Sequence, residues 1–111
     1  MVVSKKDLFD EVFQERANLF KTLAHPARLQ ILHFLAETKT CISGDISEEL
    51  PLSRTTVNQH LKELKDAGLI KGTVEGVKMN YCLDFCKVDE MKKILTDFLQ
   101  EIEFPKDFSC K

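Results

Sequence analysis

Residues 45–83 constrain the fold of this 111-residue chain more than any other stretch. A short apolar run at residues 46–50 is predicted to form a helix, and a turn at residues 51–52 follows it. Ser53 then stands where a second helix needs its N-cap, and Gly68 is placed to end that helix. Two helices joined by so short a turn predict a helix-turn-helix motif.

The residues after Gly68 predict a β-hairpin. Residues 69–74 and 77–83 alternate weakly between apolar and polar side chains, and the pair Glu75-Gly76 between them suits a tight turn. A hairpin after a helix-turn-helix is called a wing. The expected fold is therefore a mostly α winged helix-turn-helix with a small β-hairpin, and Asp45 or Ser43 is expected to cap its short first helix.

The second helix of the motif has one apolar side and one polar side. Its apolar stripe, at positions i, i+3, i+4 and i+7, consists of Val57, His60, Leu61 and Leu64. His60 is expected to be a packing residue or a hydrogen-bond donor rather than a metal ligand. The opposite side is polar and largely uncharged, which suits the reading of base edges in the major groove better than a face of lysines would.

We therefore expect this face to bind double-stranded DNA. Asn58 and Gln59 match the N6/N7 edge of adenine, Arg54 matches guanine O6/N7, and the helix N-terminus favours a phosphate. Lysines in the wing are expected to touch the backbone. The candidate DNA-binding residues are Ser53, Arg54, Thr55, Thr56, Asn58, Gln59, Lys62, Lys71 and Lys78.

Three further helices are predicted around this motif. Apolar residues follow the helical period over residues 5–21, with Arg16 as the one interruption. A helix that begins near Pro26 is apolar nearly all round and is expected to be the central core element. A long amphipathic helix is predicted over residues 88–104, and residues 105–111 are expected to form a flexible tail beyond a single domain of residues 1–104.

The first and last helices each present an apolar face that a chain of this size cannot cover. We therefore expect a homodimer through these two helices, and the alternative is that they pack on each other within one monomer.

Charge and hydropathy exclude some classes of protein. The net charge is −2, but residues 54–78 carry two excess positive charges while residues 84–103 carry three excess negative charges. This polarity permits DNA binding by the predicted motif. No apolar run approaches ~20 residues and the first residues do not resemble a signal peptide, so no membrane association and a cytoplasmic location are expected.

An enzymatic function has little support, because the sequence contains no glycine-rich phosphate loop, no nucleophile with an evident base and no cofactor motif. The main alternative from another class is a winged helix that binds proteins and has no DNA target. Such a module would show no salt-dependent DNA binding.

Four cysteines, Cys41, Cys82, Cys86 and Cys110, raise the question of a sensing site. No pair has CxxC spacing, so a zinc ribbon is not indicated. In a cytoplasmic protein, structural disulfides are not expected either. Each cysteine is either a small buried apolar residue or an accessible thiol that binds a ligand or is oxidised.

The chain resembles the ArsR/SmtB family of metal-responsive repressors over about residues 19–83. The matching stretches are FKTLAHPARLQILHFL and DISEELPLSRTTVNQHLKELKDAGLIKGTVEGVKMNYCL. The resemblance implies a dimeric winged helix-turn-helix repressor that occupies an operator and leaves it when an inducer binds. No cofactor is then required for DNA binding.

The resemblance leaves the inducer open. Arsenic-sensing members carry a CxC motif where this chain reads TCISGDI, with Cys41 alone, and zinc-sensing members use carboxylates and histidines of the last helix, which here has no histidine. Arsenite or antimonite, As(III) or Sb(III), requires three soft thiolates, which Cys41, Cys82, Cys86 and Cys110 can supply within one chain or across a dimer. We expect such a metalloid as inducer; the alternatives are thiol oxidation and an inducer that cysteine does not bind.

Overall fold

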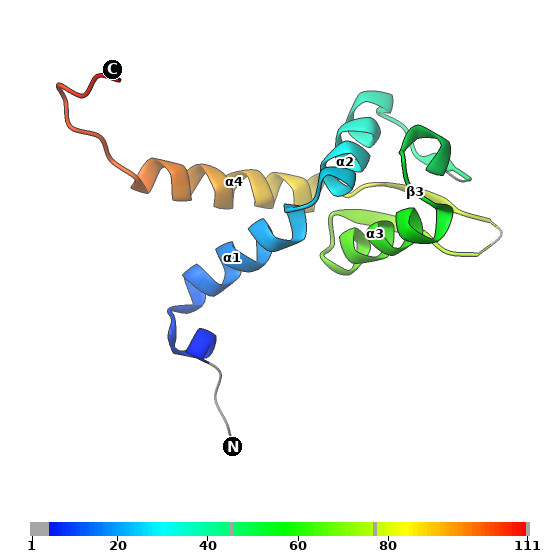
Figure 1. Ribbon diagram of the computed structural model, residues 1–111, viewed down its shortest axis with the longest axis horizontal. Coiled ribbons are helices and arrows are strands. Elements are labelled where there is room, and N and C mark those ends of the chain that lie inside the picture. Colours follow the sequence, from blue (N-terminus) through cyan, green and yellow to red (C-terminus); the bar gives the residue numbers. More distant parts are fainter. Residues whose placement is uncertain (1–4, 45, 77, 111) are drawn as a thin grey trace.

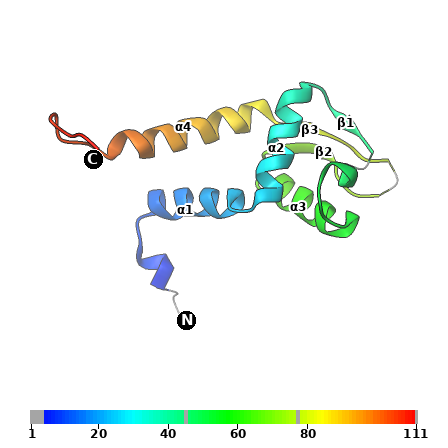
Figure 2. The same ribbon diagram turned by 45° about the horizontal axis from the view of Figure 1, so that its top comes forward.

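The computed structural model describes residues 5–44, 46–76 and 78–110. In chain order its elements are η1 (Lys5–Leu8), α1 (Glu11–Leu23), α2 (Pro26–Thr38), β1 (Ile42–Ser43), η2 (Ser47–Glu49), α3 (Arg54–Asp66), β2 (Ile70–Thr73), β3 (Asn80–Leu83) and α4 (Phe85–Glu101). Figure 1 and Figure 2 show α2, α3 and the strands gathered into one body, from which α1 and α4 extend on the same side. The predicted winged helix-turn-helix fold is confirmed.

The core lies between α2, α3 and the sheet. Its largest fully buried side chain is that of Tyr81 on β3, and α2 contributes Ile31 and Leu35. The stripe predicted for α3 is confirmed, because Val57, His60, Leu61 and Leu64 are the buried residues of that helix. α3 ends as predicted at Gly68, whose φ of +84° is one that glycine adopts without steric cost.

The wing consists of β2 and β3, which pair antiparallel as predicted. The last pair in the register is Thr73 with Asn80, so the strands are joined by a longer connection than the tight two-residue turn expected at Glu75-Gly76. A third strand, β1, pairs with the other side of β3 and is not among the strands that the sequence predicts. β1 has only two residues, too few for an alternating pattern to appear in the sequence.

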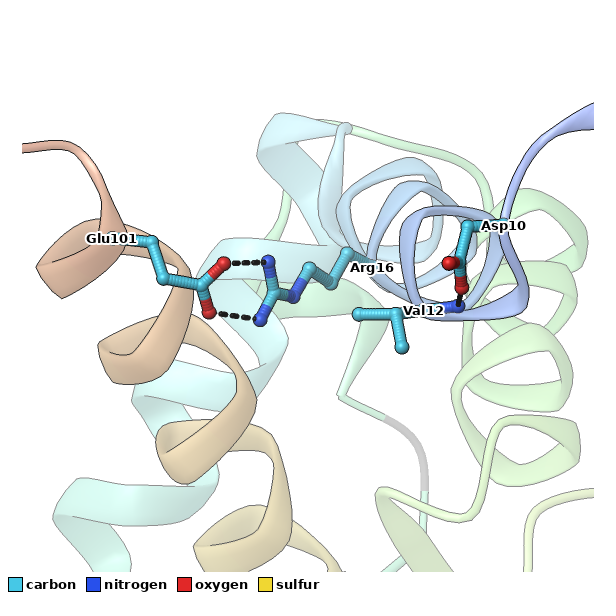
Figure 3. Close-up of polar contacts among 4 residues, drawn as sticks. All are labelled: Asp10, Val12, Arg16 and Glu101. Carbon is cyan, nitrogen blue, oxygen red and sulfur yellow. Dashed lines mark hydrogen bonds and ion pairs between the residues drawn. The ribbon is translucent and has the colours of Figure 1, made fainter.

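The predicted start of α2 is confirmed, whereas α4 begins and ends three residues before the predicted range 88–104, because Asp84 caps it by accepting from the backbone N–H of Lys87 at 3.1 Å. α2 begins at Pro26, and the Nδ1 atom of His25 accepts a hydrogen bond from the backbone N–H of Ala27 at 3.0 Å. The helix predicted over residues 5–21 is instead divided. Asp10 caps α1 by accepting from the backbone N–H of Val12 at 3.0 Å, as Figure 3 shows, and η1 precedes it as a separate turn.

Two predictions about the helices need correction. α2 is buried on one side only, through Ala27, Ile31 and Leu35, while Leu29 is 54% exposed. The helix predicted at residues 46–50 is the single 3-10 turn η2, whose N-cap Ile46 makes no side-chain capping bond. Neither proposed cap is therefore seen to act: Ser43 lies in β1, and Asp45 lies outside the described residues.

α1 and α4 contact each other but have no buried residue among those described. Arg16, which interrupts the apolar stripe of α1, forms a two-pronged ion pair with Glu101 near the end of α4 (Figure 3). Its guanidinium also lies over the rings of Phe13 and Phe98, at 5.9 and 5.6 Å from their centroids. An amphipathic helix pair with so little burial leaves much of its apolar surface in water.

Among the described residues, no helix has both the length and the hydrophobicity needed to cross a bilayer.

Candidate nucleic-acid interface

α3 turns a polar face to solvent because its apolar residues all lie on the opposite side. At its start, Ser53 Oγ accepts a hydrogen bond from the backbone N–H of Thr56 at 3.3 Å and donates one to Thr56 Oγ1 at 2.9 Å. These hydroxyls therefore fix the first turn of the helix. The N-terminus lies at the surface, where its partial positive charge is available to a phosphate.

A groove of about 340 Å³ lies between the polar face of α3 and the wing. It is lined by Thr55, Asn58, Gln59, Lys62, Glu75 and Gly76. Four of the residues predicted to bind DNA are thus brought together in one concave, polar surface. Glu75 was expected only as a turn residue, and no pattern in the sequence indicates that the wing returns to lie beside α3.

Asn58, which lines this groove, has a side-chain atom that lacks a hydrogen-bond partner among the described residues. Its side-chain oxygen Oδ1 is buried, and no described residue donates to it. A buried acceptor left unpaired costs on the order of 1–3 kcal/mol, which an incoming donor would recover. The neighbouring amide of Gln59 differs, because its Nε2 donates to Glu63 Oε1 at 3.2 Å. Because this oxygen is not committed to another residue, a rotation of the Asn58 side chain would present it to a base edge with a donor, such as the N6 amino group of adenine.

The remaining candidate DNA-binding residues lie outside the groove. Arg54 is exposed at the first position of α3, and Lys78 is exposed in the connection between the wing strands. Lys71 lies on β2 directly opposite Cys82, and it lines a second cavity beside that cysteine rather than the groove. The structure therefore brings Lys71 to the cysteines and not to the other candidate residues.

The buried side of α3 is held by a polar contact that sequence reasoning missed. Arg28 on α2 donates from Nε to Nδ1 of His60 at 3.1 Å and from Nη1 to the backbone oxygen of Thr22 at 3.0 Å. The ring of His25 lies 4.2 Å from that of His60, centroid to centroid. Burial, together with the nearby charges of His25 and Arg28, lowers the pKa of His60. His60 is thus a packing residue, as predicted, but its Nδ1 is an acceptor rather than a donor.

The four cysteines are distributed over three places. Cys41 and Cys82 are joined by a disulfide, so the expectation that the cysteines form no disulfide is wrong; the pairing of β1 with β3 brings these two residues together. Cys86 is exposed in the first turn of α4, and Cys110 is exposed on the segment after that helix. Over residues 5–44, 46–76 and 78–110, no three histidine, cysteine or acidic side chains gather into a group that could hold a metal ion. The described residues of one subunit therefore do not assemble a three-thiolate site, and such a site stays a prediction.

Comparison with known proteins identifies related sequences and folds. The family model described as "Bacterial regulatory protein, arsR family" matches residues 25–71. An uncharacterized HTH-type transcriptional regulator of Methanocaldococcus jannaschii is 33% identical over 78% of this chain and 98% of its own length. The transcriptional repressor PagR of Bacillus anthracis is 33% identical over 74% of this chain and 82% of its own length.

A solved structure supports the fold. The homodimeric winged helix-turn-helix DNA-binding domain Mb0332 from Mycobacterium bovis superposes with a TM-score of 0.53. The match covers 98% of this chain and 99% of that domain at 23% identity.

Proposed function

Because this chain belongs to the arsR family of bacterial regulatory proteins, as the matching family model and the relatives show, we propose that it is a homodimeric repressor that binds operator DNA through α3. It is a transcriptional regulator and not an enzyme. The observation that carries the proposal is the polar groove between α3 and the wing, which is lined by Asn58 and three further candidate DNA-binding residues. We propose repression rather than activation because the relative PagR is named a transcriptional repressor.

The exposed apolar residues of α1 and α4 support a homodimer. Phe13 and Phe20 on α1 are 54% and 40% exposed, and Leu99 on α4 is 64% exposed. Both helices extend away from the winged body (Figure 2), so a second copy can cover them without blocking α3. The solved Mycobacterium bovis domain of the same fold is homodimeric. A dimer would set two copies of α3 about one DNA turn apart, ~34 Å, to match two half-sites.

We further propose that an effector acts through the cysteines. Arsenite or antimonite would take two thiolates from Cys41 and Cys82 in their reduced form and a third from Cys86, Cys110 or the partner subunit. Capture beside β1 would strain the segment that leads to η2 and α3. A coupling of 1–3 kcal/mol is the usual allosteric scale and would weaken operator binding by ~5–150-fold.

One observation favours thiol oxidation as a second candidate. Cys41 and Cys82 already lie close enough to bond, with Cα atoms 4.3 Å apart, so a two-electron oxidation needs no rearrangement of the chain. The metalloid needs a third thiolate that is not beside them. The two effectors therefore differ in which cysteines they require.

Two experiments test the proposal. Duplexes are first selected from a random pool, and binding is measured by fluorescence anisotropy at several salt concentrations. We expect a palindromic site with half-sites about 10 base pairs apart and a steep salt dependence. A protein-interaction module would select no sequence and show no salt dependence.

The effector is then identified on the selected duplex. Arsenite and peroxide are titrated against complexes of the wild type and of the C86S/C110S variant, both with Cys41 and Cys82 first reduced. If arsenite releases the wild type from DNA but not the variant, the metalloid is supported. If peroxide releases both proteins, oxidation of the Cys41–Cys82 pair is supported. Failure of both reagents to release the wild-type protein would contradict sensing through cysteine.

A further inference from the structure

One face of the sheet carries Lys71 on β2 and Cys82 on β3 in a row with Cys41, which directly precedes β1. Lys71 on β2 lies directly opposite Cys82 on β3. Ile42 pairs with Tyr81, so Cys41, one position earlier, lies beside Cys82 on its other flank. Side chains at directly opposed positions point to the same face of a sheet. Lys71 and the two cysteines of the disulfide therefore lie on the same face of the sheet.

A cavity of about 240 Å³ opens beside this disulfide. Lys39 and Lys71 contribute two positive charges to its lining, and Leu35 and Phe85 contribute apolar walls. None of the described residues that line it is a carboxylate. The volume is several times the ~30 Å³ that a water molecule takes up in the liquid. Both its charge and its size suit a small organic anion.

We propose that this cavity docks a small thiol that carries a carboxylate, and that the docked thiol exchanges with the Cys41–Cys82 disulfide. The proposal deepens the oxidation mechanism suggested above and, for any effect on DNA, rests on the proposed function. The lysines attract the carboxylate, and the cavity places the sulfur of the thiol against the disulfide. Of the two cysteines, Cys41 is exposed and Cys82 is half-buried, so Sγ of Cys41 is the atom that is attacked.

The exchange follows the ordinary two steps of thiol–disulfide chemistry. The thiolate forms a new S–S bond with Cys41, the bond from Cys41 to Cys82 breaks, and Cys82 leaves with the electron pair as a thiolate. A second thiol attacks the mixed disulfide, releases Cys41 and departs as a small-molecule disulfide. Two thiols are oxidised, one protein disulfide is reduced, and the two protons lost by the thiols balance those taken up by the cysteines.

Lys71 has a second role in this scheme. When Cys82 leaves, its negative charge appears in the cavity that Lys71 also lines, at the position of β3 that pairs with Lys71. A neighbouring lysine stabilises a cysteine thiolate and so assists its departure. Lys39, the C-cap of α2, adopts a left-handed conformation and lines the same cavity. In this scheme it binds the carboxylate of the thiol.

The experiment compares thiols that differ in charge. The full-length C86S/C110S variant is oxidised with excess 2-hydroxyethyl disulfide, so that the Cys41–Cys82 bond is the one disulfide that can be reduced. Its reduction by mercaptoacetate, 2-mercaptoethanol or cysteamine is followed by alkylation and intact mass. Each rate constant is divided by that of the same thiol with 2-hydroxyethyl disulfide, which removes differences in intrinsic reactivity.

We expect the normalised rate to be ~10-fold higher for the anionic mercaptoacetate than for the cationic cysteamine at low salt. The ratio should fall to about one in 1 M salt and in the K39Q/K71Q variant. The K93Q variant, which changes an exposed lysine of α4, is the matched control and should keep the wild-type ratio.

Equal normalised rates for the two thiols would overturn the proposal, as would a ratio that survives K39Q/K71Q. Failure of the pair to oxidise would also overturn it. The assay contains no DNA, so its outcome is separate from that of the proposed function. Selective exchange by a protein that binds no operator would refute repression alone, and operator binding without selective exchange would refute the docking site alone.

Discussion

Arg28 on α2 and His60 on α3 are joined by a hydrogen bond of 3.1 Å from Nε of the arginine to Nδ1 of the histidine. The same guanidinium donates from Nη1 to the backbone oxygen of Thr22, near the end of α1. One side chain thus ties α3, the helix proposed to read DNA, to α1 and α2. Because Nδ1 of His60 must be unprotonated to accept this bond, the contact requires the neutral imidazole.

The first prediction concerns pH. Burial, then the charges of His25 and Arg28, lower the pKa of His60 below its ordinary value of 6.5 in the folded protein, against a smaller opposing effect of Glu63. The unfolded chain therefore binds this proton at a higher pH than the folded chain. The contribution of His60 to stability is present above about pH 6.5 and is lost as the pH falls from there through the folded-state pKa.

Urea unfolding between pH 8 and pH 5 measures this effect. We expect the free energy of unfolding to fall with pH in the wild type, and to fall less steeply in H60Q, whose amide oxygen can still accept from Arg28. The control is H33Q, which changes an exposed histidine that pairs with Glu37. An H60Q profile as steep as that of the wild type would contradict this account.

The second prediction concerns Gly72 on β2. Its φ is +110°, and a Cβ atom added there would lie 2.3 Å from the backbone oxygen of Asn80. Because a backbone atom cannot move aside cheaply, G72A is expected to destabilise the protein by about 2 kcal/mol or more. Gly76 is the matched control, since its φ of +88° is similar but nothing lies within 4 Å of an added Cβ.

For G76A, backbone strain alone applies, and a loss of about 1 kcal/mol is expected. Urea midpoints of the two variants measure the difference. Equal losses in G72A and G76A would show that the close approach of β3 to β2 does not exist in solution.

The third prediction tests the dimer. Phe13 on α1 is 54% exposed, and F13D should place a charge in the proposed interface. Sedimentation should then show a monomer whose circular dichroism is unchanged, because no described residue of α1 is buried in the core. Operator affinity should fall by more than ~100-fold, since two linked half-site contacts become independent.

The control for this change is F108D, which introduces the same charge at a residue with the same 54% exposure beyond α4. It is expected to remain dimeric. A wild-type protein that sediments as a monomer at micromolar concentration would contradict the proposed homodimer. An F13D protein that stays dimeric would show that the dimer interface does not include this part of α1.

The sequence predicts what depends on local pattern. The buried stripe of α3 follows from the helical period, its start from Ser53, and its end from Gly68, because each signal lies within or beside the element it defines. The wing follows from two alternating runs. These features together are enough to place the polar face of α3 at the surface.

What the sequence does not predict depends on contacts between distant segments. The pairing of β1 with β3 brings Cys41 beside Cys82, 41 positions away, and nothing near either cysteine indicates it. Arg16 interrupts the apolar stripe of α1, and the sequence gives no reason for it. The structure does, because Arg16 pairs with Glu101 on α4. Such pairs depend on how the helices and strands pack against one another. The spacing of residues along the chain does not reveal that packing.

The measurement that tests the central claim most directly compares the N58A variant with the wild type on the selected operator and on a random duplex. The account predicts that N58A weakens operator binding by ~10–100-fold, which is the usual contribution of one amide side chain that bonds to a base edge. Binding to the random duplex should be unchanged. The control K65A, which changes the basic residue in the last turn of α3, should not alter the ratio of the two affinities. Equal weakening on both duplexes, or none on the operator, would contradict the claim that α3 reads base sequence through the groove.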